Sequence, residues 1–135
     1  MAVIEQIAHY NTWRTRHEAL YPGKPFASVM LPGDENGMHF GLFDDNKLIT
    51  VISVFITGDE LQFRKFATLP AYQGKGYGTL MLSHVMAFAR DEKLKRIWCN
   101  ARTAATAFYN RFGLHEAGTP FVKNDIEYVI MERYL

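Results

Sequence analysis

The sequence has little cysteine, almost no excess of one charge and no long apolar run. Cys99 is the only cysteine among 135 residues, so an internal disulfide is excluded and a reducing compartment, the cytoplasm, is expected. Fifteen basic residues against fourteen acidic ones leave a net charge of +1, which argues against a nucleic-acid partner because such proteins usually carry a clear basic excess. No apolar run approaches the roughly 20 residues of a membrane-spanning helix, and the first residues lack the layout of a signal peptide. We therefore expect no membrane association.

Length and composition are those of one ordinary globular domain. A chain of 135 residues, of which 48% are hydrophobic and 21% are charged, is long enough to build a core. No repeat, low-complexity tract or linker-like segment divides it. The prediction is a single domain over residues 1–135, acting as a monomer or homodimer.

Apolar periodicity and turn residues predict an alternation of helices and strands. Helices are expected over residues 12–21, 78–93 and 103–112. The first of them would bury Trp13, His17 and Leu20, and the last would end at a Gly113 cap. Strands are expected over residues 38–43, 47–55, 61–68, 96–100, 114–118 and 126–134. This order predicts an α/β (α+β) fold with a mixed, mostly antiparallel sheet covered by helices.

The segment QGKGYG, residues 73–78, places three glycines between a strand-like run and a helix-like run. Bare backbone of this kind suits either a tight turn or an anionic ligand that approaches successive N–H groups at the start of a helix. The spacing Gln73-x-x-Gly76-x-Gly78 is therefore compatible with a pyrophosphate seat, to which the helix dipole adds attraction. A plain strand-to-helix turn explains the glycines equally well.

Two better-known phosphate motifs are excluded. A P-loop needs a glycine where Leu69 stands, and a serine or threonine after its lysine where Gly76 stands. The dinucleotide fingerprint would begin at Gly74, but Thr79 occupies its last glycine position. That fingerprint also follows the first strand of a βαβ unit, whereas this loop follows a run of antiparallel-type strands.

Two stretches together resemble the signatures of the GNAT superfamily of acetyl-CoA-dependent N-acetyltransferases. The first is ATLPAYQGKGYG, residues 67–78, and the second is NARTAATAFYNRFGL, residues 100–114. The order of the expected elements agrees from about Thr12 to the C-terminus. The resemblance implies a central sheet that splays open between the fourth and fifth strands, acetyl-CoA as the cosubstrate in that opening, and no metal.

The resemblance also implies a set of cofactor-binding residues. Backbone groups of Phe66 and Thr68 would pair with the pantetheine arm like an added strand, and a main-chain N–H near Phe66 or Ala67 would polarise the thioester carbonyl. Amides of the glycine loop would hold the pyrophosphate. Lys75 would add charge there or remain a solvated lysine, and Asn100 would contact the cofactor or serve as a turn residue. The implied set is Phe66, Ala67, Thr68, Gln73, Gly74, Lys75, Gly76, Tyr77, Gly78, Thr79 and Asn100.

For catalysis, the resemblance offers an acid but no clear base. Tyr109 stands where relatives often place the tyrosine that protonates the leaving thiolate; otherwise it packs as an aromatic residue beside Phe108. Some relatives carry a catalytic glutamate where this chain has Gln62, whose amide cannot accept a proton. Glu60 is the candidate base, with His39 and water as alternatives.

The predicted function is transfer of an acetyl group from acetyl-CoA to a primary amine, by direct attack in a ternary complex. A small-molecule amine is expected because the chain has no long charged arm for docking a macromolecule. Four acids near turns could attract a cationic amine or simply be solvated: Asp34, Glu35, Asp59 and Glu60. Two alternatives stay open, an acetyltransferase for a protein amine and a CoA-binding regulatory module without turnover.

Overall fold

β2 and β3 form a hairpin because two apolar runs flank a turn of aspartate and asparagine. In the computed structural model, which describes residues 1–135, β2 spans Met38–Asp44 and β3 spans Lys47–Thr57. Asp45 and Asn46 have φ values of 50° and 63°, the left-handed conformation that a two-residue hairpin turn requires and that these residue types tolerate. The strands predicted over residues 38–43 and 47–55 are confirmed.

β1, Val3–Ile7, was not predicted from the sequence. It pairs antiparallel with β2 at the end of the strand order, with Ile7 opposite His39. Most of its side chains are exposed, so the segment carries no clear apolar alternation by which it could have been found.

The backbone forms two compact units that share the strand β4, Glu60–Thr68, and the helix α2, Tyr77–Asp91. The first unit consists of Met1–Phe55 and Arg64–Val85, and the second of Ile56–Phe63 and Met86–Leu135. Within the first unit the strand order is β1-β2-β3-β4, and within the second it is β4-β5-β8-β6 with β7 beside β8. The single-domain prediction stays a prediction.

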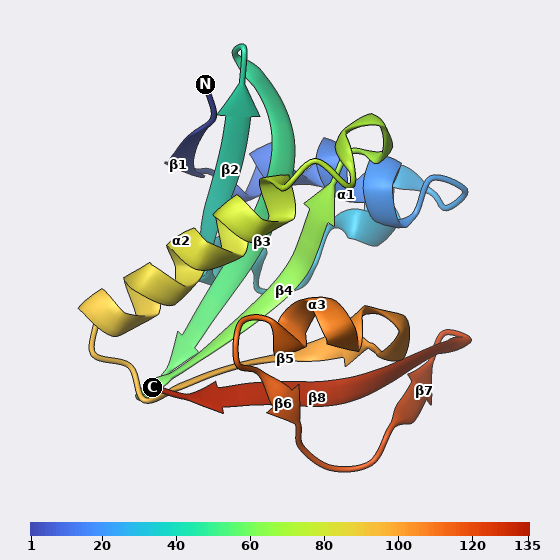
Figure 1. Cartoon of the computed structure of the whole chain (residues 1–135). Coiled ribbons are helices and arrows are strands. Elements are labelled where there is room, and N and C mark those ends of the chain that lie inside the picture. The colour runs from blue at the N-terminus through green and yellow to red at the C-terminus, as the bar shows by residue number, and fades with distance from the viewer. The chain divides into compact units, whose positions relative to one another are not determined.

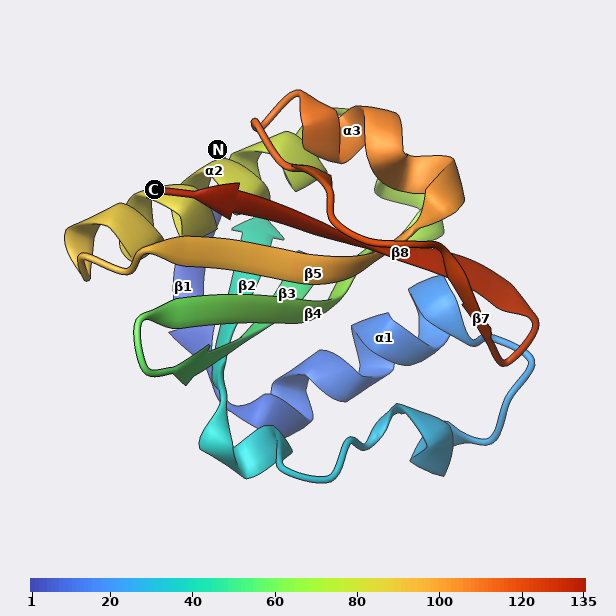
Figure 2. The ribbon, with the colours of Figure 1, turned by 90° about the horizontal axis from the view of Figure 1, so that it is seen from below.

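In the first unit, α1 (Trp13–Leu20) and the first turns of α2 cover opposite faces of the β2–β3 pair (Figure 1 and Figure 2). On one face the Phe40 ring of β2 packs against the His84 ring of α2, with their centroids 5.2 Å apart. On the other face the Ser53 hydroxyl of β3 accepts a hydrogen bond from Arg16 of α1. The apolar residues that recur at helical spacing in α2 are buried: Leu82, Val85, Met86 and Ala89.

The predicted buried face of α1 is wrong. The helix buries Thr15 and Arg16, and it leaves Trp13, His17 and Leu20 only partly buried. Hydrogen bonds around the arginine, rather than an apolar stripe, hold this helix. A search for apolar periodicity therefore selects the wrong side of it.

The second unit is built on β8, Ile126–Tyr134. β5, Arg96–Arg102, pairs antiparallel with β8 along its whole length, so that Cys99 lies opposite Met131. Both of these residues are buried and belong to the core. The predicted strands 96–100 and 126–134 are confirmed, and β5 is two residues longer than expected.

Three short elements complete the second unit: β6 at His115–Glu116, β7 at Phe121–Lys123 and α3 at Thr106–Asn110. β6 and β7 both pair with β8, and α3 lies beside the β5–β8 pair (Figure 2). β7 was not predicted, because all three of its side chains are exposed. The predicted stop at Gly113 is confirmed: its φ is 80°, a conformation that ends a helix and suits glycine.

β4 and β5 run parallel, with Glu60–Gln62 opposite Arg96–Trp98. The hydrogen-bonded pairing covers only the first three residues of each strand. Together with the antiparallel pairs, this confirms the predicted mixed, mostly antiparallel sheet. None of the helices combines the length and the apolar character needed to span a membrane.

A buried ion pair in the first unit joins α1 to the segment that follows it. The Arg16 guanidinium donates to Asp34 through both terminal nitrogens, Nη1 to Oδ2 at 2.8 Å and Nη2 to Oδ1 at 3.0 Å. It also donates to the Val29 carbonyl and the Ser53 hydroxyl, each at 2.8 Å. The two charged residues are 0% and 2% exposed. Burial by itself would raise the pKa of Asp34, but the hydrogen bonds from Arg16 and Trp13 hold it below its usual value.

Replacing Arg16 by methionine should lower the free energy of unfolding by about 3–5 kcal/mol, because Asp34 would stay buried without its partner. Arg14→Met on the same helix is the matched control. Arg14 pairs with Glu18 at an exposed i,i+4 position, and such pairs contribute about 0.5 kcal/mol or less. Urea denaturation measures both variants. Equally small losses would contradict a structural role for the buried pair.

Candidate active site

β4 is interrupted at Lys65, the only non-glycine residue inside a strand that has a left-handed backbone, with φ of 52°. A single left-handed residue breaks the alternation of a strand and re-aims the peptide groups that follow, in the manner of a bulge. The groups that follow are those of Phe66, Ala67 and Thr68, the residues predicted to contact the cofactor arm. The conformation costs about 1–2 kcal/mol for a residue with a side chain, and such strain concentrates at functional sites.

The C-terminal end of β4 is fastened to its neighbours. The hydroxyls of Thr68 and Thr50 of β3 share a hydrogen bond of 3.0 Å, and the Leu69 N–H donates to the Ile49 carbonyl at 2.9 Å. The side-chain amide of Gln73 reaches back and donates to the Thr68 carbonyl at 3.0 Å. The glutamine that begins the predicted signature therefore ties the loop to the strand.

The loop after β4 presents a run of unpaired backbone N–H groups. From Gly74 to Thr79 no amide has an acceptor in the protein, and the first hydrogen bond leading into α2 is that of the Leu80 N–H to the Gly76 carbonyl, at 3.1 Å. The Gln73 amide, which was predicted to belong to this set, instead donates back into the preceding turn at 3.4 Å. An anion placed here would meet free N–H groups and the positive end of the α2 dipole.

Two glycines give this run its shape. Gly74 and Gly76 have φ values of 76° and 89°, which side chains other than glycine rarely adopt. Nothing lies within 4 Å of the position that a Cβ would take on either residue. The space beside the unpaired amides is therefore open to a ligand.

Two lysines share one aromatic ring beside the loop. The Nζ atoms of Lys75 and Lys47 lie 5.6 and 5.1 Å from the centre of the Tyr72 ring. Lys47 comes from the start of β3, and no sequence pattern connects it with the loop. The Tyr77 hydroxyl donates to Asp44 Oδ2 at 2.6 Å, which lowers the pKa of Asp44, raises that of Tyr77, and ties the start of α2 to the β2–β3 turn.

Tyr109 lies in α3 of the second unit, with its ring against those of Phe63 and Phe108 at centroid distances of 5.8 and 5.3 Å. Burial raises the pKa of its hydroxyl, the nearby Cys99 thiol adds to this, and Arg102 opposes it. The hydroxyl forms no hydrogen bond within the protein. It therefore keeps its proton at neutral pH and has a donor available.

Two residues of β5 lie close to each other in the sequence but differ in environment. Cys99 is buried, and burial raises the pKa of its thiol to about 12, so the reactive thiolate is almost absent at neutral pH. Asn100 is exposed, and its backbone pairs with Ile130 of β8. Its contact with the cofactor stays a prediction.

Glu60 is poorly placed for the role of base. Its carboxylate accepts a hydrogen bond from Arg96 at 3.2 Å. It begins β4 and belongs to the second unit, in the short stretch that pairs with β5. Its bond to Arg96 weighs against Glu60 as a free base.

His39 is already engaged in the core of the first unit. It is 2% exposed, and its two ring nitrogens contact the Ser53 hydroxyl and the Asp34 carbonyl, both at 2.7 Å. Burial lowers its pKa, so the ring is neutral at neutral pH. Because both nitrogens are occupied, neither is free to accept a proton from a substrate.

Two of the four acids that could attract a cationic amine are already paired with arginines. Asp34 is buried and neutralised by Arg16, and Glu60 is bound by Arg96. That interpretation is wrong for both. No group of three or more histidine, cysteine, aspartate or glutamate side chains is arranged to hold a metal ion.

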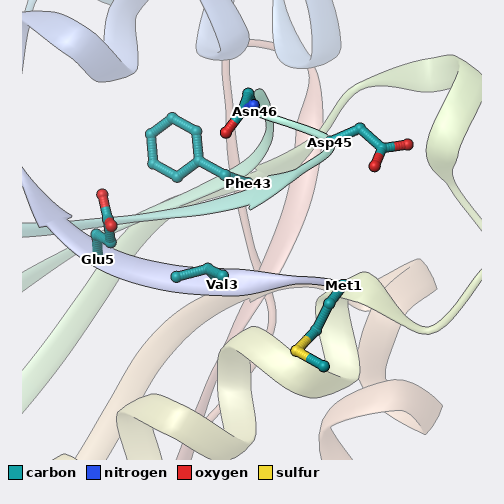
Figure 3. A pocket seen from close by; sticks show the side chains of 6 residues that line it. All are labelled: Met1, Val3, Glu5, Phe43, Asp45 and Asn46. Carbon is teal, nitrogen blue, oxygen red and sulfur yellow. The ribbon is translucent and has the colours of Figure 1, made fainter.

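A shallow hollow of about 500 Å³ lies at the edge of the first unit. Figure 3 shows the side chains around it, which come from the N-terminus, β1, the end of β2 and the turn that follows: Met1, Val3, Glu5, Phe43, Asp45 and Asn46. It contains none of the predicted site residues. The features that suit a ligand are therefore those of the backbone at the start of α2.

A strand with a left-handed break, followed by a loop of unpaired amides that opens a helix, suits a phosphate-bearing cofactor. The sequence comparison identifies the class. Residues 5–114 match the Acetyltransferase (GNAT) family, and the chain belongs to that family. It is an acetyl-CoA-dependent N-acetyltransferase.

Three relatives illustrate the similarity. N-acetyltransferase YitI of Bacillus subtilis (strain 168), described as uncharacterised, is 26% identical over 130 residues, which cover 90% of this chain and 87% of that protein. The [ribosomal protein bS18]-alanine N-acetyltransferase of Haemophilus influenzae is 25% identical over 115 residues, 84% of this chain and 71% of that protein. The paiA N-acetyltransferase of Thermoplasma acidophilum, solved in complex with coenzyme A, has the same fold with a TM-score of 0.80 at 14% identity, covering 100% of this chain and 99% of that one.

Gly76→Ala should weaken acetyl-CoA binding at least about 10-fold, because a methyl group would enter the space beside the unpaired amides. Gly118→Ala is the matched control, since Gly118 has a similar φ of 91°, an equally open surrounding and a place in the second unit. Both variants carry the same backbone strain, so a difference in affinity reports the site. Calorimetric titration measures the Kd, and equal affinities in two folded variants would contradict a phosphate seat in this loop.

Proposed function

We propose that this enzyme transfers the acetyl group of acetyl-CoA directly to the primary amine of a small molecule, within a ternary complex. The observation that carries the proposal is the run of unpaired amides from Gly74 to Thr79, an anion seat at the start of α2. All the proposed cofactor-binding residues except Asn100 belong to the first unit. The relative solved with coenzyme A supports CoA as the occupant. We place the enzyme in the cytoplasm, since its one cysteine is a free thiol.

The reaction requires a neutral amine. An alkyl amine with a pKa near 10.4 is neutral only about once in 2,500 molecules at pH 7, a cost of roughly 4–5 kcal/mol. The neutral nitrogen forms a bond to the acetyl carbon while the carbon–sulfur bond breaks. The nitrogen then gives up one proton, and the CoA thiolate takes one. A main-chain N–H at Phe66 or Ala67, just beyond the break at Lys65, would polarise the carbonyl.

Water is the proposed acceptor of the amine proton. Glu60 is bound by Arg96, both ring nitrogens of His39 are occupied, and Gln62 cannot accept a proton. A water chain can act as a positioned base and is compatible with all three observations.

Tyr109 is the proposed donor to the leaving sulfur, on the family resemblance of its position. Because its pKa lies above the ordinary value near 10, it is a weaker acid than a thiol of pKa about 8.5. Full proton transfer to a free thiolate would therefore cost about 2 kcal/mol or more. Its contribution is a hydrogen bond to the sulfur while the carbon–sulfur bond lengthens.

Tyr109→Phe should lower the single-turnover rate by about 10- to 1,000-fold and leave acetyl-CoA affinity and Tm nearly unchanged, since only the hydroxyl is removed. The wild-type rate should show no loss from deprotonation of Tyr109 below about pH 10, because the pKa is raised. Tyr134→Phe, which removes a hydroxyl from an exposed tyrosine of the same unit, is the control. A normal single-turnover rate for Tyr109→Phe would leave packing as the role of this ring.

A protein N-terminal amine is the second candidate acceptor. The observation that favours it is the similarity to the [ribosomal protein bS18]-alanine N-acetyltransferase of Haemophilus influenzae, at 25% identity over 115 residues. Against it stands the lack of a long charged arm for docking a macromolecule. A third reading, a CoA-binding module without turnover, predicts cofactor binding alone.

Release of the CoA thiol across a panel of small primary amines tests the proposal. We expect turnover well above hydrolysis with at least one class of small amine, and at least 10-fold less at limiting acetyl-CoA in Gly76→Ala. Acetylation of folded proteins or their N-terminal peptides, with no small amine accepted, would favour the second candidate. Tight acetyl-CoA binding without transfer to any amine would favour the regulatory module.

A further inference from the structure

We propose that Lys65 and Tyr21 bind an acid group on the acceptor, so that the preferred substrates are small primary amines that also carry a carboxylate. This inference rests on the proposed function, since it names the acceptor of that reaction. Both residues belong to the first unit, Lys65 in β4 and Tyr21 directly after α1.

The two side chains form one close contact. Lys65 Nζ donates to the Tyr21 hydroxyl at 2.6 Å and lies 4.8 Å from the centre of the Tyr21 ring. Both residues are half-buried. No ion pair of the structure includes Lys65, so its charge has no carboxylate partner within the protein.

The hydrogen-bonding groups that remain unused at this contact are donors. An ammonium group has three N–H donors, and one of those on Lys65 is used by Tyr21. The Tyr21 oxygen accepts that bond, and its own hydrogen has no acceptor in the protein. Two ammonium donors and one hydroxyl donor therefore have no acceptor within the protein. A carboxylate satisfies them, whereas a second amine would add another donor and another positive charge.

The charges nearby agree with an anionic ligand. Arg64, next to Lys65, lies with its guanidinium carbon 5.9 Å from the Phe55 ring centre and takes part in no ion pair. Glu18, the one acid of α1, is engaged by Arg14. The consecutive cations of β4 thus keep their charge for a ligand.

The position of Lys65 sets the distance between the acid and the amine. Lys65 directly precedes Phe66, one of the two residues whose N–H is proposed to polarise the thioester carbonyl, and consecutive Cα atoms are about 3.8 Å apart. An acid held by the Lys65 ammonium would lie within about the reach of one lysine side chain of the acetyl carbon. That spacing suits an amino acid or a short acidic amine.

A purely structural role for the contact makes a different prediction. Lys65 and Tyr21 could simply brace the end of α1 against β4, in which case removal of the charge would change stability and leave substrate preference alone. The ratio of kcat/KM for an amino acid to that for its carboxamide separates the two roles, because both substrates offer the same amine and only one carries the acid.

We expect the wild-type enzyme to prefer amino acids over their carboxamides at least 10-fold. Lys65→Met keeps the apolar stem and should bring that ratio down to within about 3-fold of unity, mainly through KM, while Lys65→Arg should keep part of it. Lys93→Met is the control, since Lys93 is exposed and has a similar left-handed φ of 57°. Tyr21→Phe, which removes one donor and keeps the ring, should lower the ratio by a smaller factor and serves if Lys65→Met does not fold. A preference that survives in Lys65→Met, or a wild-type enzyme with no preference, would overturn the proposal.

Binding without turnover provides an independent measurement. N-acetyl amino acids and N-acetyl amino-acid amides are titrated calorimetrically into protein saturated with CoA. If no amine is acetylated but the acids bind tightly and only when Lys65 is present, the acid site stands and the proposed function fails. If the amines turn over but the acids bind no better than the amides, the acid site fails alone. Short peptides with acidic N-terminal residues, tested beside free amino acids, distinguish a peptide source of the carboxylate from a free one.

Discussion

The buried ion pair of Arg16 and Asp34 is the interaction on which the position of α1 in the first unit depends, and with it the proposed acid site at Tyr21 and Lys65. Two charges removed from water are costly, and here the cost is offset by a two-pronged ion pair together with bonds to the Val29 carbonyl and the Ser53 hydroxyl. Asp34 further accepts bonds from the Trp13 indole and the Leu31 amide. A well-packed apolar pair could be equally stable at such a site. What the charged pair adds is geometry, since each donor fixes one acceptor at one distance.

A series of contacts connects this ion pair in the core with Lys65, the left-handed residue of β4. Arg16 holds α1 against β3 through Ser53, and the chain leaves α1 at Tyr21. Tyr21 then contacts Lys65, the residue whose left-handed backbone re-aims the peptide groups after it. The ion pair, the end of α1 and the break in β4 are thus joined by successive hydrogen bonds within one unit.

The sequence allowed the conformation of the glycine loop to be predicted because its signal is local. Three glycines between a strand and a helix report the backbone conformation directly, and the structure has left-handed φ values at Gly74 and Gly76. The buried face of α2 is equally predictable from the sequence, since its residues are apolar and recur at helical spacing. The role of Gln73 was less accessible: its side chain binds the Thr68 carbonyl, which no spacing rule indicates.

The elements that were missed lack such a signal. β1 and β7 have mostly exposed side chains, so neither shows apolar alternation. The buried face of α1 is polar, and its partners Val29, Asp34 and Ser53 lie 13 to 37 positions away in the chain. An arginine is expected at the surface from sequence alone, and only the assembled fold reveals that both terminal nitrogens of Arg16 find acceptors in the core.

The state of the titratable groups connects the mechanism with the choice of substrate. The pKa of about 12 at Cys99 leaves on the order of one thiolate in 10⁵ at pH 7, so an acetyl-cysteine intermediate is disfavoured and the amine must attack the thioester itself. The two side chains considered as the base for that amine are already engaged, Glu60 by Arg96 and His39 at both ring nitrogens. A bound acid alone would lower the fraction of neutral amine further, because a negative charge raises the pKa of a neighbouring ammonium. In the proposed acid site, Lys65 and Arg64 would reverse the sign: they would neutralise the acid and, as nearby cations, would lower the pKa of the amine, each pKa unit reducing the cost of the neutral form by about 1.4 kcal/mol. The same cations that would select an acidic amine would therefore prepare it for attack.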